Sequence, residues 1–227
     1  VVTVLLSWWA LPRFLPHTAE HHAEAKAARE RHGSAWLEPR TLLIGVVVFA
    51  AAFTEGTAND WLAVAFVEGH DLPAWAGVLA FATFLTAMTI GRLVGTRLLD
   101  RHGRVPVLRV SFALAALGAA MVIFGSAWLA FIGAAVWGVG AALGFPVGMS
   151  ASADDATRAA ARMSVVATIG YVAFIAGPPL LGLLGDSVGV LRSLLVVGAL
   201  AILALSVVPA VREPAGGTGD RAPAASA

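Results

Sequence analysis

Six long apolar segments follow one another along the chain, and they limit its fold more than any other feature. They cover residues 41–67, 74–99, 105–124, 127–150, 163–184 and 190–208. About 20 consecutive, mostly apolar residues are enough for a helix to cross a bilayer. A helix of a soluble protein instead has a polar face that interrupts its apolar positions. Because several of these segments are apolar all round, the sequence predicts an all-α membrane protein, a six-transmembrane-helix bundle.

The composition supports a membrane setting and argues against several classes of function. Hydrophobic residues make up 59% of the 227 residues and charged residues 13%, against about half and about a quarter in soluble domains. The net charge is +1, and the arginines are scattered, so we expect no nucleic-acid partner. The chain has no cysteine, which removes disulfides, thiolate metal sites and cysteine nucleophiles.

Histidines in the polar amino-terminal segment raise the question of a metal site. His17 and His21 are one helical turn apart, but no acid or cysteine completes a ligand set at a suitable spacing. A solvated loop explains them better. The sequence also lacks a Ser/His/Asp arrangement, a phosphate-binding loop and a dinucleotide fingerprint. We therefore expect no metal, no cofactor and no catalytic residue, so the protein is not expected to be an enzyme.

Basic residues gather in every second gap between the spans, and this alternation predicts orientation, since short cytoplasmic loops are rich in Lys and Arg. The arginines on that side are Arg97, Arg101, Arg104, Arg109, Arg158, Arg162, Arg212 and Arg221. We expect residues 1–11 to be the end of a preceding transmembrane helix and residues 12–40 to be a cytoplasmic loop. Residues 41–210 would form the six-helix half-domain. Residues 211–227, which have little to bury, would be a disordered cytoplasmic tail.

The most specific motif bridges the second and third spans, where residues 91–104 read GRLVGTRLLDRHGR. Gly91 and Gly95 are four residues apart, so they share a helix face and let a neighbouring helix approach closely. Asp100 can pair with the arginines of the tight turn after it or with a helix amino terminus. Gly103 supplies the backbone freedom that such a turn needs. A stop-transfer turn carrying positive-inside arginines is the simpler alternative.

A second polar group lies inside the first span, where residues 55–61 read EGTANDW. An ionised carboxylate near the bilayer centre costs about 2.5 to 3.5 kcal/mol, so such residues usually face a polar cavity. Glu55 is close to mid-span, Asn59 follows one turn later on the same face, and Asp60 lies a step round toward the outer end. Gly56 would loosen the helix, as in the midplane sites of transporters. Acids held in interhelical hydrogen bonds are the alternative.

The fourth and fifth spans are rich in glycine and proline. Pro146, Pro178 and Pro179 are expected to kink their helices and to free carbonyl groups that neighbouring residues or water must satisfy. Kinked helices can rock during a transport cycle. Close packing alone is an equal alternative, because glycine and proline are frequent in membrane helices.

Residues 91–104 resemble the signature of the major facilitator superfamily, a glycine-containing segment followed by Asp-Arg-x-Gly-Arg between the second and third helices of each half. The resemblance covers the whole chain and implies the carboxyl-terminal half of a twelve-helix fold, with a 3+3 inverted repeat. The missing amino-terminal half would be its partner. One departure is that Gly95 lies five residues before Asp100 rather than four, where Thr96 stands.

The resemblance also implies roles for particular residues. A cytoplasmic gate motif would be formed by Gly91, Arg92, Gly95, Asp100, Arg101, Gly103 and Arg104. Asp100, Arg101 and Arg104 would act as its latch. Tyr171 would face the central cavity, and with Glu55, Asn59 and Asp60 it would line the substrate and proton pathway.

These features predict a secondary active transporter that moves a small sugar-like or drug-like solute by alternating access, with a proton as the coupling ion implied by the resemblance. A mostly apolar cavity with one or two acids favours a neutral or cationic molecule. The expected setting is the lipid bilayer of a bacterial inner membrane, crossed several times. The alternative is a membrane scaffold or regulatory protein that transports nothing, in which Glu55 and Asp60 only hold helices together. A membrane enzyme is the third possibility, disfavoured by the missing catalytic clusters.

Overall fold

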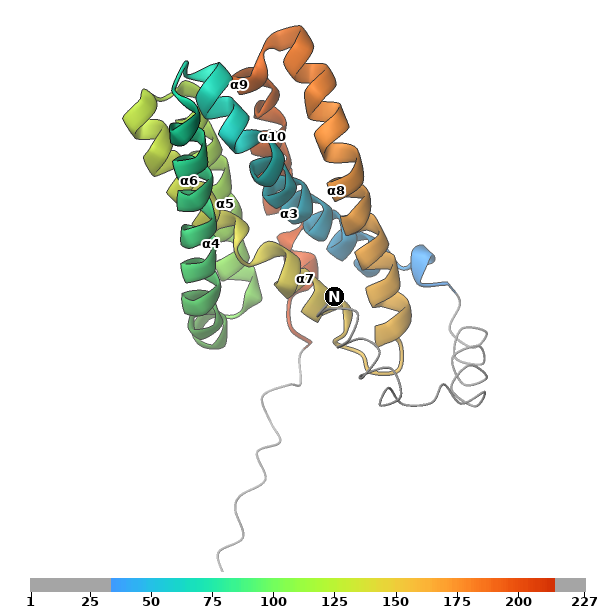
Figure 1. Ribbon diagram of the computed structural model, residues 1–227. Coiled ribbons are helices and arrows are strands. Elements are labelled where there is room, and N and C mark those ends of the chain that lie inside the picture. Colours follow the sequence, from blue (N-terminus) through green and yellow to red (C-terminus); the bar gives the residue numbers. More distant parts are fainter. Residues whose placement is uncertain (1–33, 215–227) are drawn as a thin grey trace, which may run out of the picture. The chain divides into compact units, whose positions relative to one another are not determined.

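The computed structural model describes residues 34–214, and this part of the chain is a bundle of helices without a β-strand (Figure 1). Its elements are η2 (Ala35–Leu37), α3 (Pro39–Val64), η3 (Ala65–Gly69), α4 (Ala74–His102), α5 (Arg104–Phe124), α6 (Ala127–Ala141), α7 (Gly144–Ser152), α8 (Ala159–Val188), α9 (Val190–Ser193), α10 (Leu195–Val207) and η4 (Val208–Val211). The expectations for residues 1–11, for most of the loop 12–40 with its histidines, and for the tail beyond 214 lie outside the described residues.

Taken singly or together with the elements that directly follow, these elements form six helical spans that are long and apolar enough to cross a membrane. They are Pro39–Gly69, Ala74–His102, Arg104–Phe124, Ala127–Ser152, Ala159–Val188 and Val190–Val211. The predicted six-helix, all-α membrane bundle is confirmed. The fifth span begins four residues earlier than the sequence indicated, because the alanines at 159–161 continue the helix toward the polar turn before it.

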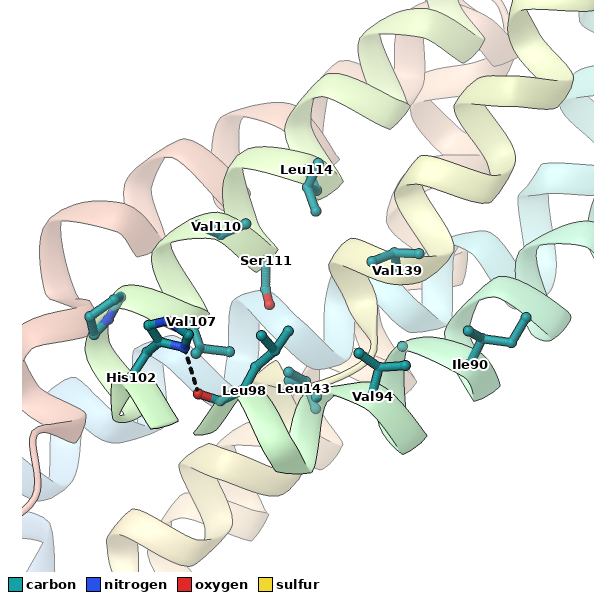
Figure 2. Close-up of a pocket in the computed structure, with 13 residues that line it drawn as sticks. Ile90, Val94, Leu98, His102, Val107, Val110, Ser111, Leu114, Val139 and Leu143 are labelled. Atoms are coloured by element: carbon teal, nitrogen blue, oxygen red, sulfur yellow. Dashed lines mark hydrogen bonds between the residues drawn. The ribbon is translucent and has the colours of Figure 1, made fainter. Parts of the chain in front are cut away.

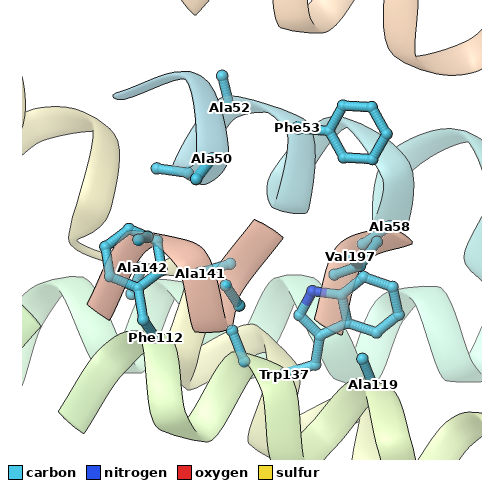
Figure 3. Close-up of a cluster of buried hydrophobic side chains, with 14 of the residues drawn as sticks. Ala50, Ala52, Phe53, Ala58, Phe112, Ala119, Trp137, Ala141, Ala142 and Val197 are labelled. Atoms are coloured by element: carbon cyan, nitrogen blue, oxygen red, sulfur yellow. The ribbon is translucent and has the colours of Figure 1, made fainter. Parts of the chain in front are cut away.

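Helix α3 is the most buried span: 72% of its apolar window lies inside the bundle, against 22% for α4. It packs against α4, α7, α8 and α10. Figure 3 shows part of the core, where side chains from α3, α5, α6 and α10 meet around the fully buried ring of Trp137. The low burial of α4 leaves much of its surface for lipid, for a cavity or for another part of the protein.

Glycines set the distance between α5 and α6. A Cβ atom added to Gly118 of α5 would collide with the backbone of α6 at Trp137, and one added to Gly140 of α6 would collide with the backbone of α5 at Ala115. In a membrane, packing of this kind drives helix association, because lipid removes most of the hydrophobic driving force between helices. The two backbones therefore touch with almost no side-chain layer between them.

The prolines act differently in the fourth and fifth spans. The fourth span is broken between Ala141 and Gly144, as Figure 1 shows, and Pro146 follows the break. Proline has no N–H to donate to the carbonyl four residues earlier, which here belongs to Ala142. Helix α8, in contrast, continues without interruption through Pro178 and Pro179.

Gly56 does not loosen α3 as the sequence suggested, since the helix continues through it from Pro39 to Val64. A Cβ atom at Gly56 would lie 2.9 Å from the ring of Phe174 on α8. The glycine therefore makes room for a neighbouring aromatic side chain instead of interrupting the backbone hydrogen bonds.

Candidate functional site

The centre of the candidate site is an ion pair between two spans. Nη2 of Arg92 on α4 donates to Oε1 of Glu55 on α3 at 3.0 Å. Nε of the same guanidinium donates to the carbonyl oxygen of Ala142 at 3.2 Å, and Nη2 also approaches the sulfur of Met88 at 3.6 Å. The Glu55 side chain is 16% exposed and the Arg92 side chain 45%. The pair thus joins three helical segments and keeps the cation partly open.

Both charges lie within the spans and away from the ends of the helices. Glu55 is 16 residues after Pro39 and 14 before Gly69, and Arg92 is 10 residues before the end of α4 at His102. At 1.5 Å per residue, each is about 15 Å or more along its helix from the nearer end. Charges at such depth are rare and mark solute or ion pathways when they face a cavity.

The sequence builds this pair from the α6–α7 break and the paired glycines. Pro146 leaves the Ala142 carbonyl without its usual helical donor, so the carbonyl can accept from Arg92. Gly91 and Gly95 face the same break: added Cβ atoms would lie 2.9 Å from Cβ of Ala142 and 2.6 Å from the side chain of Leu143, respectively. The predicted close approach at these glycines is confirmed, and it brings the guanidinium within reach of the freed carbonyl.

Polar side chains exposed within the spans lie mainly on α3, α4 and α8. They are Asn59 and Asp60 of α3, Thr86, Thr89, Arg92 and Thr96 of α4, and Thr168 and Tyr171 of α8. The large exposed side chains of α5, α6 and α10 are mostly apolar, such as Leu117, Ile132 and Ile202, and Arg109 near the start of α5 is an exception. We refer to the surface formed by this first set as the polar face. The hydroxyls of Thr89, Thr96 and Thr168 donate to carbonyls of their own helices. The cost of polar groups in lipid therefore applies mainly to the charged and amide side chains of the set.

The side chains of Asn59 and Asp60 form no hydrogen bond or ion pair with any residue between 34 and 214. The alternative of acids held between helices therefore applies to Glu55, which Arg92 holds, and has no support for Asp60 in this part of the chain. Tyr171 is 59% exposed. It lies three residues before Phe174, the residue that covers Gly56 next to Glu55.

A cavity of about 480 Å³ with both polar and apolar lining lies beside Arg92, and we call it the polar cavity because several charged side chains line it. Its lining includes Arg92, Thr96, Asp100, Arg104, Ser150 and Glu213, together with Leu99, Leu143, Pro146 and Val147. An apolar groove of about 430 Å³ runs along α4, α5 and α6 (Figure 2). Ser111 and His102 supply its only polar side chains, and Nδ1 of His102 is 3.3 Å from the Leu98 carbonyl of its own helix. The two hollows differ in chemistry, and Arg92 belongs to the polar one.

One end of the bundle carries a dense set of ion pairs, which we call the arginine-rich cluster. It consists of Glu38, Arg40, Arg104, Asp154, Arg158 and Arg162. Asp154, whose side chain is 7% exposed, accepts from Arg40 and from Arg104, each at 2.8 Å. Glu38 pairs with Arg158 and accepts from Nε of Arg162 at 2.7 Å. The cluster ties the starts of α3, α5 and α8 to the turn between α7 and α8.

The environment of the cluster favours ionised acids. Burial by itself raises the pKa of Glu38, but hydrogen bonds from Thr41 and Arg162 and the charges of Arg162 and Arg158 outweigh it, so the pKa lies below its ordinary value. A hydrogen bond from Thr157 lowers the pKa of Asp155, with a further contribution from the nearby arginines. Hydrogen bonds to the charged form of an acid act in this direction.

The residues of the predicted gate motif separate into distinct environments. Arg92 lies deep in the span with Glu55, and Arg104 belongs to the arginine-rich cluster, where its backbone N–H also donates to Glu213 at 2.7 Å. Gly103 has a φ of +79°, as its predicted role in the turn requires. The side chains of Asp100 and Arg101 are exposed and make no ion pair or hydrogen bond within the described range. The structure therefore differs from the expected pairing of Asp100 with the arginines of its own turn.

Sequence reasoning used Arg158 and Arg162 only to orient the chain and also gave Arg104 a latch role by resemblance, but it did not find the acidic partners of these arginines. Asp154 and Glu38 lie in the turn between the fourth and fifth spans and just before the first span. Acids beside several arginines at span ends were the available signal. They come together only because the starts of α3 and α8 are neighbours in the bundle.

Comparison with known proteins gives independent information on the fold. The structure resembles that of the Escherichia coli fucose:proton symporter FucP, with a TM-score of 0.68 and 15% sequence identity, over 83% of this chain and 46% of that one. This likeness supports the helical arrangement.

Sequence relatives point the same way. The chain is 33% identical over 187 residues to an uncharacterized MFS-type transporter of Yersinia pestis, covering 79% of this chain and 47% of that protein. It is 26% identical to the membrane protein MosC of Rhizobium meliloti, covering 72% of this chain and 41% of MosC. A class H tetracycline resistance protein of Pasteurella multocida is 36% identical over 126 residues, which cover 53% of this chain and 30% of that protein.

The chain thus spans less than half the length of the curated relatives that it matches. The family model of the Major Facilitator Superfamily matches residues 47–226, which include most of the bundle. With six apolar helices that can each cross a membrane, the chain is a multi-pass integral membrane protein, and it belongs to the Major Facilitator Superfamily.

Proposed function

We propose that this chain is the carboxyl-terminal half of a secondary active transporter that moves a small sugar-like or drug-like solute by alternating access, coupled to protons. The observation that carries the proposal is the Glu55–Arg92 ion pair, deep in the spans and next to a polar cavity. A carboxylate in such a place can bind and release protons as the pathway opens to either side. The fucose:proton symporter and the tetracycline resistance protein are named for handling small molecules, which agrees with this substrate range.

The polar face supports a second half as partner. Charged and polar side chains within the spans meet a water-filled cavity or another protein segment, because lipid does not satisfy them. In our proposal the face formed by α3, α4 and α8 lies against an amino-terminal half and encloses the pathway, with Asn59, Asp60 and Tyr171 in its lining. Relatives about twice as long as the match leave room for that half.

The arginine-rich cluster marks the cytoplasmic side in this proposal, in a bacterial inner membrane. The positive-inside rule places arginine-rich loop ends there. Asp100 and Arg101, which have no partner in the described residues, would then be available to latch against the other half when the cytoplasmic gate closes.

The test is transport by the full-length protein reconstituted in liposomes. A panel of sugars and drug-like molecules is presented under an imposed proton gradient, and solute-driven proton movement is recorded with a pH-sensitive dye. We expect Glu55→Gln to abolish proton-coupled movement while the protein still inserts. Glu68→Gln, a matched change at an exposed acid in η3, which directly follows α3, should retain it. Unchanged coupling in Glu55→Gln would remove Glu55 from the mechanism.

The scaffold alternative has one observation in its favour, since the same ion pair also holds α3 to α4. It predicts no transport for any member of the panel. It also predicts that Glu55→Gln and Arg92→Gln lower the stability of the protein without any effect on solute movement. Solute movement that depends on Glu55 would exclude it.

A further inference from the structure

Arg92 has unused hydrogen-bonding capacity. A guanidinium has five N–H donors. Nε donates a hydrogen bond to the Ala142 carbonyl, and Nη2 donates to Glu55 and approaches the sulfur of Met88. The two N–H groups of Nη1 have no partner among residues 34–214. The side chain is 45% exposed and lines the polar cavity, so this free edge is accessible to a ligand.

The guanidinium is also held in place by a contact that does not depend on Glu55. The Ala142 carbonyl is available because Pro146 cannot donate to it, and Gly91 lets the two segments approach. If Glu55 lost its charge, Arg92 would keep its Nε bond and its position. Arginine held in this way presents a planar set of donors that matches a carboxylate or a phosphate.

We infer that Arg92 binds an anionic group of the transported solute, and that Glu55 is an internal carboxylate that neutralises Arg92 when this group is absent. The inference rests on the proposed transport function and names its substrate class: a small solute that carries a carboxylate or a comparable anion. A sugar acid or an acidic drug-like molecule has this chemistry.

The exchange conserves charge at the site. Before binding, the Glu55 carboxylate and the Arg92 guanidinium sum to zero. After binding, the proton is on a Glu55 carboxyl oxygen, the ion pair to Arg92 is broken, and the solute anion pairs with Arg92, so the sum is again zero. Because the proton removes the competitor of the anion, proton and anion bind together. The site therefore couples them in the same direction.

Few other groups can take part in this titration. Arg92 is the charged residue in contact with Glu55. Helices α6, α7 and α10, which also pack against α3, contain no titratable side chain. On α8, Arg162 belongs to the arginine-rich cluster, Asp186 lies near the far end, and Tyr171 makes no hydrogen bond within the described residues. Asp60 on α3 and Glu68 of η3 lie further toward the opposite end of the bundle.

The remaining lining of the cavity is compatible with an anion near Arg92. Thr96 and Ser150 contribute hydroxyl groups. Arg104 is neutralised by Asp154 and lies near Glu213, and Asp100 is eight residues beyond Arg92 toward the end of α4. The expectation of a neutral or cationic solute was based on a mostly apolar cavity with one or two acids. Arg92, with two N–H donors that have no partner among residues 34–214, favours an anionic group on the solute instead.

The experiment compares anions with neutral molecules of the same shape. Purified full-length protein in detergent is titrated with benzoate, acetate and sulfate, and with benzamide and acetamide as neutral controls, and binding is followed by the shift of the thermal unfolding midpoint. In the wild type we expect anion binding to be weak at neutral pH and tighter at mildly acidic pH. Glu55→Gln should bind anions at least about tenfold more tightly at neutral pH and lose the pH dependence, because the competing state is removed.

Arg92→Gln should abolish the anion response, and Arg92→Lys should keep a weakened one, while Glu68→Gln should behave as the wild type does. If Glu55→Gln is not monodisperse, Glu55→Ala serves the same purpose. The inference is overturned if neutralising Glu55 leaves anion affinity unchanged, or if Arg92→Gln still responds to anions. Transport of a neutral solute in liposomes, with no anion response, would leave the proposed transport function standing without this inference. An anion response without transport would support the anion site at Arg92 and contradict the proposed transport function.

Discussion

The acids of the arginine-rich cluster and the acid in the middle of α3 are neutralised in different ways. Asp154 and Glu38 each pair with two arginines, and the paired groups connect the starts of three spans. Among residues 34–214, Glu55 has one cationic partner, Arg92, which is nearly half exposed and has two N–H donors without a partner in this range. Acids that are each neutralised by two arginines at the ends of the spans are suited to a structural role, in which they stabilise the packing of the helices. The single, partly exposed Glu55–Arg92 ion pair within the membrane is suited to an exchange of partners during function.

The largest effect in this comparison is expected for Asp154→Asn. The change removes the carboxylate from two arginines at once, and the acid is almost fully buried. Breaking such a pair by removing one partner costs about 3 kcal/mol. Thermal unfolding in detergent should show a clear drop in the midpoint. The matched control is Asp155→Asn, whose carboxylate is 41% exposed and forms an ion pair with Arg162 at 3.3 Å. An equal drop for both variants would contradict a structural role for the ion pairs of Asp154.

A smaller loss of stability is expected for Glu55→Gln, about 1 kcal/mol or less. Arg92 keeps the Ala142 carbonyl and remains exposed to the cavity, so the uncompensated charge is not sealed in the bundle. Unfolding midpoints measured beside those of Asp154→Asn give the ranking directly. A loss of stability for Glu55→Gln as large as that for Asp154→Asn would mean that the Glu55–Arg92 ion pair also has a mainly structural role.

The loss of folding stability at low pH should depend in part on the protonation of Glu38. Its folded-state pKa lies below the ordinary value of 4.5, so its contribution is complete above that value and is lost as the pH falls through the folded pKa. Glu38→Gln should therefore weaken the loss of stability below about pH 4.5 and lower the stability at neutral pH. Unfolding midpoints over a pH series check this. Parallel curves for the variant and the wild type would show that Glu38 does not contribute.

The smallest effect is expected for Asp100→Asn. Asp100 is exposed and has no partner in the described residues, so its replacement should change the free energy of unfolding by less than about 0.5 kcal/mol. Transport by the full-length protein should nevertheless fall if Asp100 latches against the other half. A large loss of stability would place Asp100 in a contact within this half.

The fold could be predicted from the sequence because hydropathy and length are properties of each segment alone. The span boundaries, the break near Pro146 and the mid-span position of Glu55 all follow from local rules. The partner of Glu55 could not be found in this way. It depends on the axial register of α4 against α3, which is set by Gly91 and Gly95 meeting the broken fourth span. The resemblance implied a gate role for the motif that contains Arg92, and the sequence did not indicate that Arg92 would reach Glu55.

The backbone contact between α5 and α6 has a mechanical consequence. Most helices can slide or roll past one another because flexible side chains between them change rotamer. At Gly118 and Gly140 that layer of flexible side chains is missing, so we expect α5 and α6 to move together as one rigid unit. We therefore expect any bending of the fourth span to occur in the few residues between Ala141 and Gly144, where the helix is interrupted.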